Sequence, residues 1–155
     1  MMKERLRKPS NRDVMQIREV TVADAEAIAG LLASLGYPGC EEFIAAQIAA
    51  QIVHPDARLL VAAGGDGVAG FISLHFVPQI ALAGDFCRIS YFCVAEDKRG
   101  QGIGEALERA AAALAEERGC DRIEVHCHSR RSGAHRFYQR QGFVESPKYF
   151  AKAVG

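Results

Sequence analysis

Hydrophobic residues recur along this chain with two different periods, and the two kinds of segment follow one another without a linker. A spacing of three or four residues predicts helices over 24–35, 41–53, 103–118 and 132–141. Alternating or continuous apolar runs predict strands over 14–20, 58–63, 68–77, 86–94 and 122–128, with one or two closing strands over 143–153. The resulting order, β-α-α-β-β-β-α-β-α-β, predicts a single mixed α/β domain.

Glycine and proline mark the ends of these segments. Gly64-Gly65-Asp66-Gly67 separates two strand patterns with residues that favour a tight turn, so a β-hairpin is predicted there. His54-Pro55 ends the second helical pattern. Gly119 and Gly142 stand where the third and fourth helical patterns stop.

Length and composition are those of one globular domain. The chain has 155 residues, of which 49% are hydrophobic and 25% are charged. The 19 basic residues balance the 19 acidic ones, so no overall charge draws the protein to nucleic acid or to an anionic surface. No apolar run reaches the length of a membrane span. We therefore expect a cytoplasmic protein with neither nucleic acid nor membrane as a partner.

The N-terminal residues differ from the rest by their basic charge. Between Met1 and Arg12, five basic residues accompany one acid, Glu4, without the apolar middle of a secretory signal. We interpret 1–14 as a flexible basic tail, followed by a single domain over 15–155. A nucleic-acid-binding arm and a chain start at Met15 are the alternatives.

Five cysteines are scattered through apolar segments: Cys40, Cys87, Cys93, Cys120 and Cys127. They form no CxxC pair and no cysteine–histidine cluster with the spacing of a zinc site, so no metal centre is predicted. Their odd number and apolar surroundings indicate buried, reduced thiols of a cytosolic protein.

The segment Arg99-Gly100-Gln101-Gly102-Ile103-Gly104 leads directly into the longest helical pattern. Backbone with few side chains at a helix start exposes N–H groups at the positive end of the helix dipole, which suits a phosphate or pyrophosphate. Gly104 is followed by Glu105 and Ala106 rather than by the Lys-Ser/Thr of a P-loop. The glycines stand at every second position and come after about four strands, which excludes the dinucleotide G-x-G-x-x-G fingerprint.

Two segments resemble one family of enzymes. Arg99 to Gly104 is similar to the Q/R-x-x-G-x-G/A signature for acetyl-CoA in the GNAT superfamily of N-acetyltransferases. Arg131 to Tyr138, followed by Gly142-Phe143, resembles the R-x-x-A-H-x-F-Y…G-F segment of small bacterial members. The order of predicted elements is also that of the family over about 15–153. The resemblance implies a GNAT-like α+β fold with a central, mostly antiparallel, splayed sheet of six to seven strands, flanked by about four helices.

The resemblance also implies how acetyl-CoA is held as the co-substrate. Backbone amides of the loop would hold its pyrophosphate, from Arg99, Gly100, Gln101, Gly102, Ile103 and Gly104. The pantetheine arm would lie where the strand ending at Val94 splays from the strand 123–128, beside Phe92, Cys93 and Val94. The Val94 N–H is then the expected donor to the thioester carbonyl. Further contacts are expected from Ser129, or alternatively Ser132, and from Ala134 and Phe137.

An acid and a base complete the expected chemistry. Tyr138 stands at the position of the family's usual general acid, where its phenol would protonate the departing CoA thiolate. The alternative for Tyr138 is an aromatic ring that packs at the edge of the core. A protonated amine has no lone pair and needs a base, for which His126 is favoured over Glu124, His128, His75, Glu96 and a water chain.

The acceptor is defined less closely. Its pocket is expected between the loop that joins the first two helices and the middle strands, from Tyr37, Pro38, Glu41, Glu42, His75, Phe76, Arg88 and Ser90. We expect acetyl transfer to a primary amine of a small molecule by direct attack in a ternary complex. The alternatives are a protein N-terminal or lysine acetyltransferase and an acyl-CoA-binding module without turnover. Tyr149, Phe150 and Val154 predict either a homodimer interface or packing on the domain's own core.

Overall fold

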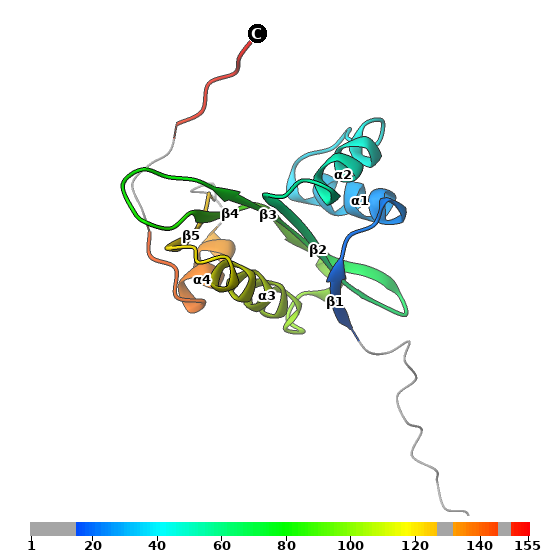
Figure 1. The fold of residues 1–155 in the computed structure, drawn as a ribbon. Coiled ribbons are helices and arrows are strands. Elements are labelled where there is room, and N and C mark those ends of the chain that lie inside the picture. The colour runs from blue at the N-terminus through cyan, green and yellow to red at the C-terminus, as the bar shows by residue number, and fades with distance from the viewer. Residues whose placement is uncertain (1–14, 127–131, 146–149) are drawn as a thin grey trace, which may run out of the picture.

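A five-stranded sheet forms the middle layer of the molecule, with helices on both of its faces (Figure 1). The computed structural model describes residues 15–126, 132–145 and 150–155, so the predicted basic tail lies outside the described residues. The strands are β1 (Gln16–Glu19), β2 (Ala57–Gly64), β3 (Gly67–Val77), β4 (Phe86–Val94) and β5 (Arg122–Val125). The helices are α1 (Ala25–Leu35), α2 (Ile44–Ile52), α3 (Ile103–Glu117) and α4 (Ser132–Arg140), with short 3-10 turns η1 (Val22–Asp24) and η2 (Glu96–Lys98). None of the described helices is long and apolar enough to cross a membrane.

The strands lie in the sheet in the order in which they occur in the chain. Pairs β1–β2, β2–β3 and β3–β4 are antiparallel, whereas β4–β5 is parallel, which confirms a mostly antiparallel sheet. Gly64 pairs with Gly67 at the predicted hairpin, so Gly65 and Asp66 form its two-residue turn. The parallel pair needs a crossover connection, which α3 provides.

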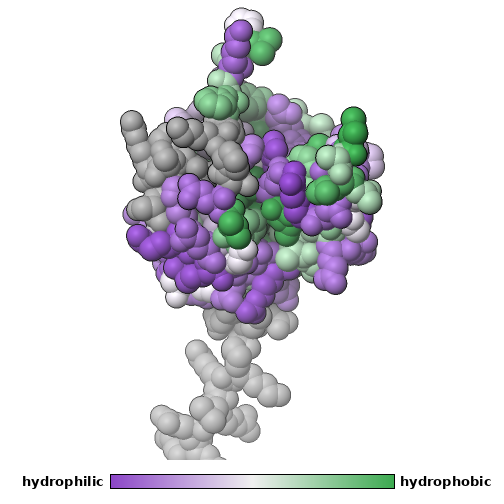
Figure 2. Space-filling view, turned by 90° about the vertical axis from the view of Figure 1, so that its left-hand side faces the viewer, coloured by the Kyte–Doolittle hydropathy of each residue, from purple (hydrophilic) through white to green (hydrophobic). Residues whose placement is uncertain are grey.

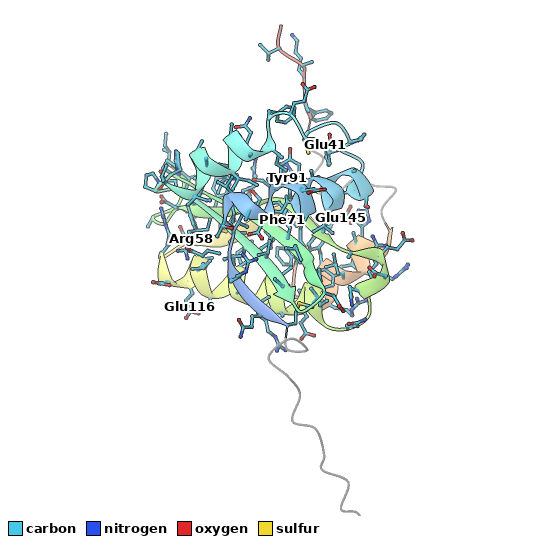
Figure 3. The ribbon with its side chains drawn as sticks, turned by 90° about the vertical axis from the view of Figure 1, so that its right-hand side faces the viewer. Glu41, Arg58, Phe71, Tyr91, Glu116 and Glu145 are labelled. Atoms are coloured by element: carbon cyan, nitrogen blue, oxygen red, sulfur yellow. The ribbon has the colours of Figure 1, made fainter. Side chains whose placement is uncertain are left out.

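The central strands carry a hydrophobic core on each face of the sheet. Ile72 and Leu74 of β3 belong to the core that Leu107 of α3 covers. Phe71, which precedes Ile72 in β3, belongs to the core on the opposite face, together with Ile28 of α1. Figure 3 shows Phe71 in the layer between the sheet and the helices on that side. Burial on both faces explains why this strand reads as an almost continuous apolar run in the sequence.

The prediction of six to seven strands is wrong for the described residues, because the expected closing strand over 143–153 is not formed in its described parts. Gly142 ends α4 with a φ of +90°, and the Phe143 N–H donates to the Tyr138 carbonyl at 2.9 Å. Phe143 then packs against the α3-side core instead of joining the sheet. Phe150 and Val154 are 91% and 97% exposed, so they pack on neither core. Tyr149 lies outside the described residues, and the homodimer stays a prediction.

An ion pair at the start of α1 fastens β1 to the first helix. Asp24 is 6% exposed, and Arg18 donates to both of its carboxylate oxygens at 2.8 Å. The Thr21 N–H donates to the same carboxylate at 2.8 Å. The guanidinium of Arg18 is the main reason why the pKa of Asp24 is lowered.

The described cysteines are not disulfide-bonded. Cys40, Cys87 and Cys93 are buried, and Cys120 is half-buried, as the sequence predicted for reduced thiols. Burial raises the pKa of the Cys87 thiol to about 12, which keeps it protonated and unreactive. Cys127 lies outside the described residues.

Candidate functional site

The glycine-rich loop between η2 and α3 is open on its outer side and anchored on its inner side. Gly100 and Gly102 have φ angles of +78° and +81°, in the left-handed region that side chains rarely adopt. A Cβ atom added at either glycine would meet nothing within 4 Å. Ile103, the first residue of α3, is 6% exposed and belongs to the α3-side core. The loop is therefore fixed by its last residues and leaves space for a ligand above its glycines.

The start of α3 supplies the polar groups of this site. Ala106 donates its N–H to the Gly102 carbonyl at 3.0 Å, which is the first bond of the helical ladder. N–H groups that precede this bond at a helix start have no acceptor within the helix. Together with the helix dipole, they fit an anionic pyrophosphate. The role of this loop stays a prediction, and its geometry supports that prediction.

Two glycines serve close packing instead. A Cβ atom at Gly104 would lie 3.4 Å from the Phe137 ring and 3.7 Å from Val94, so α4 packs against α3 at this point. A Cβ atom at Gly70 of β3 would lie 2.9 Å from Leu107, because α3 rests directly on the sheet there. A glycine inside a strand pattern signals such a close approach, but the sequence does not tell which element approaches.

The sheet opens between β4 and β5. Their parallel pairing ends at Ile89 and Val125, while β4 continues to Val94. The Ala95 N–H donates to the carbonyl of Ala69 in β3 at 2.7 Å. Because N–H groups of successive strand residues point to opposite edges, the Val94 N–H points toward the β5 side. This geometry fits the predicted splay and the predicted donor at Val94.

β4 carries one additional residue at the point where the two strands part. In the pairing with β3, Ser73 faces Tyr91 and Leu74 faces Ile89, so Ser90 has no counterpart. Such a β-bulge changes the direction of a side chain and is frequent beside active sites. Ser90 follows the last residue of β4 that pairs with β5.

Tyr138 lies in an aromatic cluster between α4 and β4. Its ring centroid is 5.5 Å from that of Phe137, 5.5 Å from that of Phe143 and 6.3 Å from that of Phe92. Each pair meets edge to face, which is a favourable arrangement. Tyr138 therefore does pack against other aromatic rings, as the alternative to a catalytic role predicts. The same contacts place its ring beside Phe92 of β4.

A chain of hydrogen bonds joins three elements on the other face of the sheet. His75 of β3 lies with Nδ1 2.6 Å from the Ser90 hydroxyl and with Nε2 3.0 Å from Gln51 Oε1 of α2. Burial lowers the pKa of His75, and the nearby His54 adds to this effect. The sequence named His75 and Ser90 as candidates but missed Gln51, which is separated from His75 by 24 positions.

An ionic cluster occupies the neighbouring part of β4 and β5. Glu124 accepts from Arg88 at 3.2 Å and pairs with Arg122 at 3.0 Å, so two guanidinium groups engage this base candidate. Both arginines also lie over the Phe86 ring, 5.4 Å and 5.8 Å from its centroid. The Arg88 Nε atom is buried and has no hydrogen-bond partner among the described residues.

The remaining predicted residues are more dispersed. His126 is exposed just beyond β5, and Glu96 is exposed in η2, where it lines a shallow groove beside α1. Cys93 faces the α1-side core, so only its backbone can contact a ligand in the opening. Ala134 is half-buried on α4. His128 and Ser129 lie outside the described residues, and the side chain of Ser132 is not described.

Two tyrosines and an acid lie at the end where the α1–α2 loop approaches β4. Tyr37 and Tyr91 meet edge to face with centroids 5.3 Å apart and are 54% and 40% exposed. Figure 3 shows Tyr91 and Glu41 toward this same end. Figure 2 views the molecule from the left-hand side of Figure 1, and the coloured part of that surface is mostly hydrophilic, with hydrophobic residues in small separate areas.

A sheet that opens between two parallel strands, beside a glycine loop at a helix start, fits the fold that the resemblance of the sequence implies. A sequence model of the acetyltransferase (GNAT) family matches residues 24–143. The chain therefore belongs to this family, and the predicted acetyl-CoA-dependent N-acetyltransferase is confirmed at that level. The family implies acetyl-CoA as the co-substrate.

Relatives agree with this assignment. An aminoalkylphosphonate N-acetyltransferase from Salmonella typhimurium is 29% identical over 146 residues, which cover 91% of this chain and 92% of the relative. A structure described as a transcriptional regulator from Bacillus halodurans C-125 has a TM-score of 0.84 and 26% identity, over 91% of this chain and 100% of that one. Glucosamine-6-phosphate N-acetyltransferase from Arabidopsis thaliana has the same fold, with a TM-score of 0.81 at 17% identity, over 92% and 100% of the two chains.

Proposed function

We propose that this enzyme transfers the acetyl group of acetyl-CoA to the primary amine of a small molecule, by direct attack in a ternary complex. The observation that carries the proposal is the opening between β4 and β5: Val94 lies beside Gly104 at the start of α3, and Phe92 lies beside Tyr138 of α4. In that arrangement the loop binds the pyrophosphate and the Val94 N–H donates to the thioester oxygen.

Tyr138 is the general acid of the proposed reaction. The nitrogen–carbon bond forms as the carbon–sulfur bond breaks, and the departing thiolate takes the phenolic proton. The ring contact between Tyr138 and Phe92 supports this role, because Phe92 belongs to the stretch of β4 assigned to the pantetheine arm.

The acceptor is proposed to be a small amine that carries an anionic group. The Salmonella relative is described by its action on aminoalkylphosphonates, which are amines of this kind. In this chain Arg88 of β4 pairs in register with His75 of β3 and supplies a positive charge beside it. The Arg88 side chain as a whole is 37% exposed, and a phosphonate or carboxylate would pair favourably with the accessible part of its guanidinium.

Release of CoA thiol from acetyl-CoA tests the proposal. The panel compares 2-aminoethylphosphonate with ethanolamine and propylamine, which keep the amine and lack the anion, and with peptides that offer an N-terminus or a lysine. We expect turnover with the small amines and the highest kcat/KM for the phosphonate. Turnover with peptides alone would replace this proposal with a protein acetyltransferase, and tight binding of acetyl-CoA without any turnover would indicate a binding module.

Tyr138→Phe tests the acid. It keeps the aromatic packing and removes the hydroxyl, so kcat is expected to fall about 100-fold while the acetyl-CoA Kd stays close to that of the wild type. Isothermal titration gives the Kd and thiol release gives kcat. Unchanged kcat would remove Tyr138 from this role.

A further inference from the structure

The hydrogen-bond chain through His75 has a direction. Gln51 Oε1 can only accept a hydrogen bond, so the His75 Nε2–H donates to it. In the neutral imidazole, Nδ1 then carries the lone pair and accepts from the Ser90 hydroxyl at 2.6 Å. With the Gln51 amide in this orientation, the contact is consistent with the tautomer in which His75 can draw on the Ser90 proton.

The position of Ser90 connects this chain to the opening in the sheet. Ser90 is the bulged residue of β4, directly after the last β4–β5 pair, so it stands at the base of the opening. The side chains of Ser90 and His75 are both half-buried.

We propose that Ser90 and His75 form the proton-accepting relay for the amine, with Gln51 as the residue that positions the imidazole. As the nitrogen–carbon bond forms, the amine proton passes to Ser90 Oγ, and the Ser90 proton passes to His75 Nδ1. The carbon–sulfur bond breaks, and its electron pair leaves with the thiolate. His75 then returns the proton to solvent, and the Tyr138 phenolate, which has given its proton to the thiolate, takes up one proton from solvent. This inference rests on the proposed function, because it supplies the base for that reaction.

The surroundings of His75 keep the imidazole in its neutral, proton-accepting form. Burial is the main cause of its lowered pKa, and the exposed His54 after α2 contributes positive charge. On β4, its register partner is Arg88, whose charge is partly balanced by Glu124 of β5. On β2, its register partner is the uncharged Ala57.

The first test compares His75→Gln and Ser90→Ala with the wild type. For the wild type, kcat/KM is expected to rise with pH through the lowered pKa of His75, because a base must be unprotonated to act. His75→Gln is expected to lower kcat by about 100-fold or more, with an unchanged acetyl-CoA Kd. It is also expected to remove the rise of kcat/KM at acidic pH, which we call the acidic limb of the pH profile. Ser90→Ala is expected to lower kcat in the same direction. Melting temperatures show whether each variant is folded.

The second test moves the pKa of His75 without removing it. Gln51→Glu places a carboxylate beside Nε2, so the acidic limb is expected to shift by about one pH unit or more toward higher pH. Gln47→Glu is the matched control: it makes the same charge change one turn earlier on α2, at an exposed position. It is expected to leave the pH profile in place.

The outcomes separate the relay from the function itself. If the wild type turns over but Gln51→Glu does not shift the acidic limb, the relay is overturned and the proposed function stands. The same holds if the wild type turns over and both Ser90→Ala and His75→Gln keep a normal kcat. If His126→Gln removes the acidic limb and His75→Gln keeps it, the relay is also overturned, and the base is assigned to His126. Absence of wild-type turnover with every amine overturns both proposals. If His75→Gln does not fold, Ser90→Ala and Gln51→Glu decide.

Discussion

Replacing Gly102 with alanine tests whether the glycine loop binds acetyl-CoA, because it introduces backbone strain whose cost can be estimated from the φ angle of this residue. Gly102 has a φ of +81°, and an added Cβ would meet nothing within 4 Å. The left-handed conformation costs an L-residue about 1–2 kcal/mol. Alanine also restricts the unfolded chain, which offsets about 0.4–1 kcal/mol of that cost. The expected net loss of unfolding free energy is therefore about 1 kcal/mol, or about 2–4 °C in Tm for a chain of this size.

The same substitution should weaken acetyl-CoA binding. If the loop relaxes away from the left-handed conformation, binding must restore it at a cost of about 1–2 kcal/mol. That cost corresponds to a Kd that is about 5- to 30-fold higher. The new methyl group also enters the open space where the pyrophosphate is proposed to lie, which acts in the same direction.

Gly119→Ala is the matched control at the other end of α3. Gly119 has a φ of +70° and, like Gly102, nothing within 4 Å of an added Cβ. Both variants should lose similar stability in thermal unfolding, whereas only Gly102→Ala should lose affinity in isothermal titration with acetyl-CoA. Equal Kd values for the two variants and the wild type would refute the assignment of this loop. Gly104 is less suitable for the test, because a side chain there would also disturb the Phe137 contact.

Two further predictions concern stability and its dependence on pH. Asp24→Asn should lower the unfolding free energy at pH 7 by about 1–2 kcal/mol, since it breaks the ion pair with Arg18. The pKa of Asp24 is lowered in the folded protein, so this contribution is complete above the ordinary value of 3.8 and is lost as pH falls through the folded value. Urea unfolding at pH 7 and pH 3 measures it, and an equal loss at both would contradict the ion-pair explanation. Glu19→Gln, which removes the exposed pair with Arg58, should change little. Burial raises the pKa of Glu108, so its ionised form disfavours folding as pH rises through that value. Glu108→Gln should therefore raise Tm at pH 7 and leave it unchanged at pH 4; a lower Tm at pH 7 would show that the carboxylate has a stabilising partner.

The closing segment shows where local pattern stops being informative. Apolar residues over 143–153 satisfy the pattern of a strand, yet Phe143 packs beneath α4 and Phe150 is exposed. A strand pattern indicates that a segment can pack in a sheet, but the segment forms a strand only if an unpaired strand lies close enough to pair with it. The turn at Gly142, with its left-handed backbone, directs the chain back onto the end of α4.

The sequence by itself determined the helices and the first strands, the hairpin at Gly65-Asp66 and the glycine loop before α3. These features depend on periodicity and on backbone freedom, which act between residues close in the chain. Only the tertiary structure decided that Gly104 serves packing and that Gln51, His75 and Ser90 form one hydrogen-bonded chain. Periodicity reports which face of an element is buried but not which element covers it. The bulge that brings Ser90 to His75 exists only in the pairing of β3 with β4.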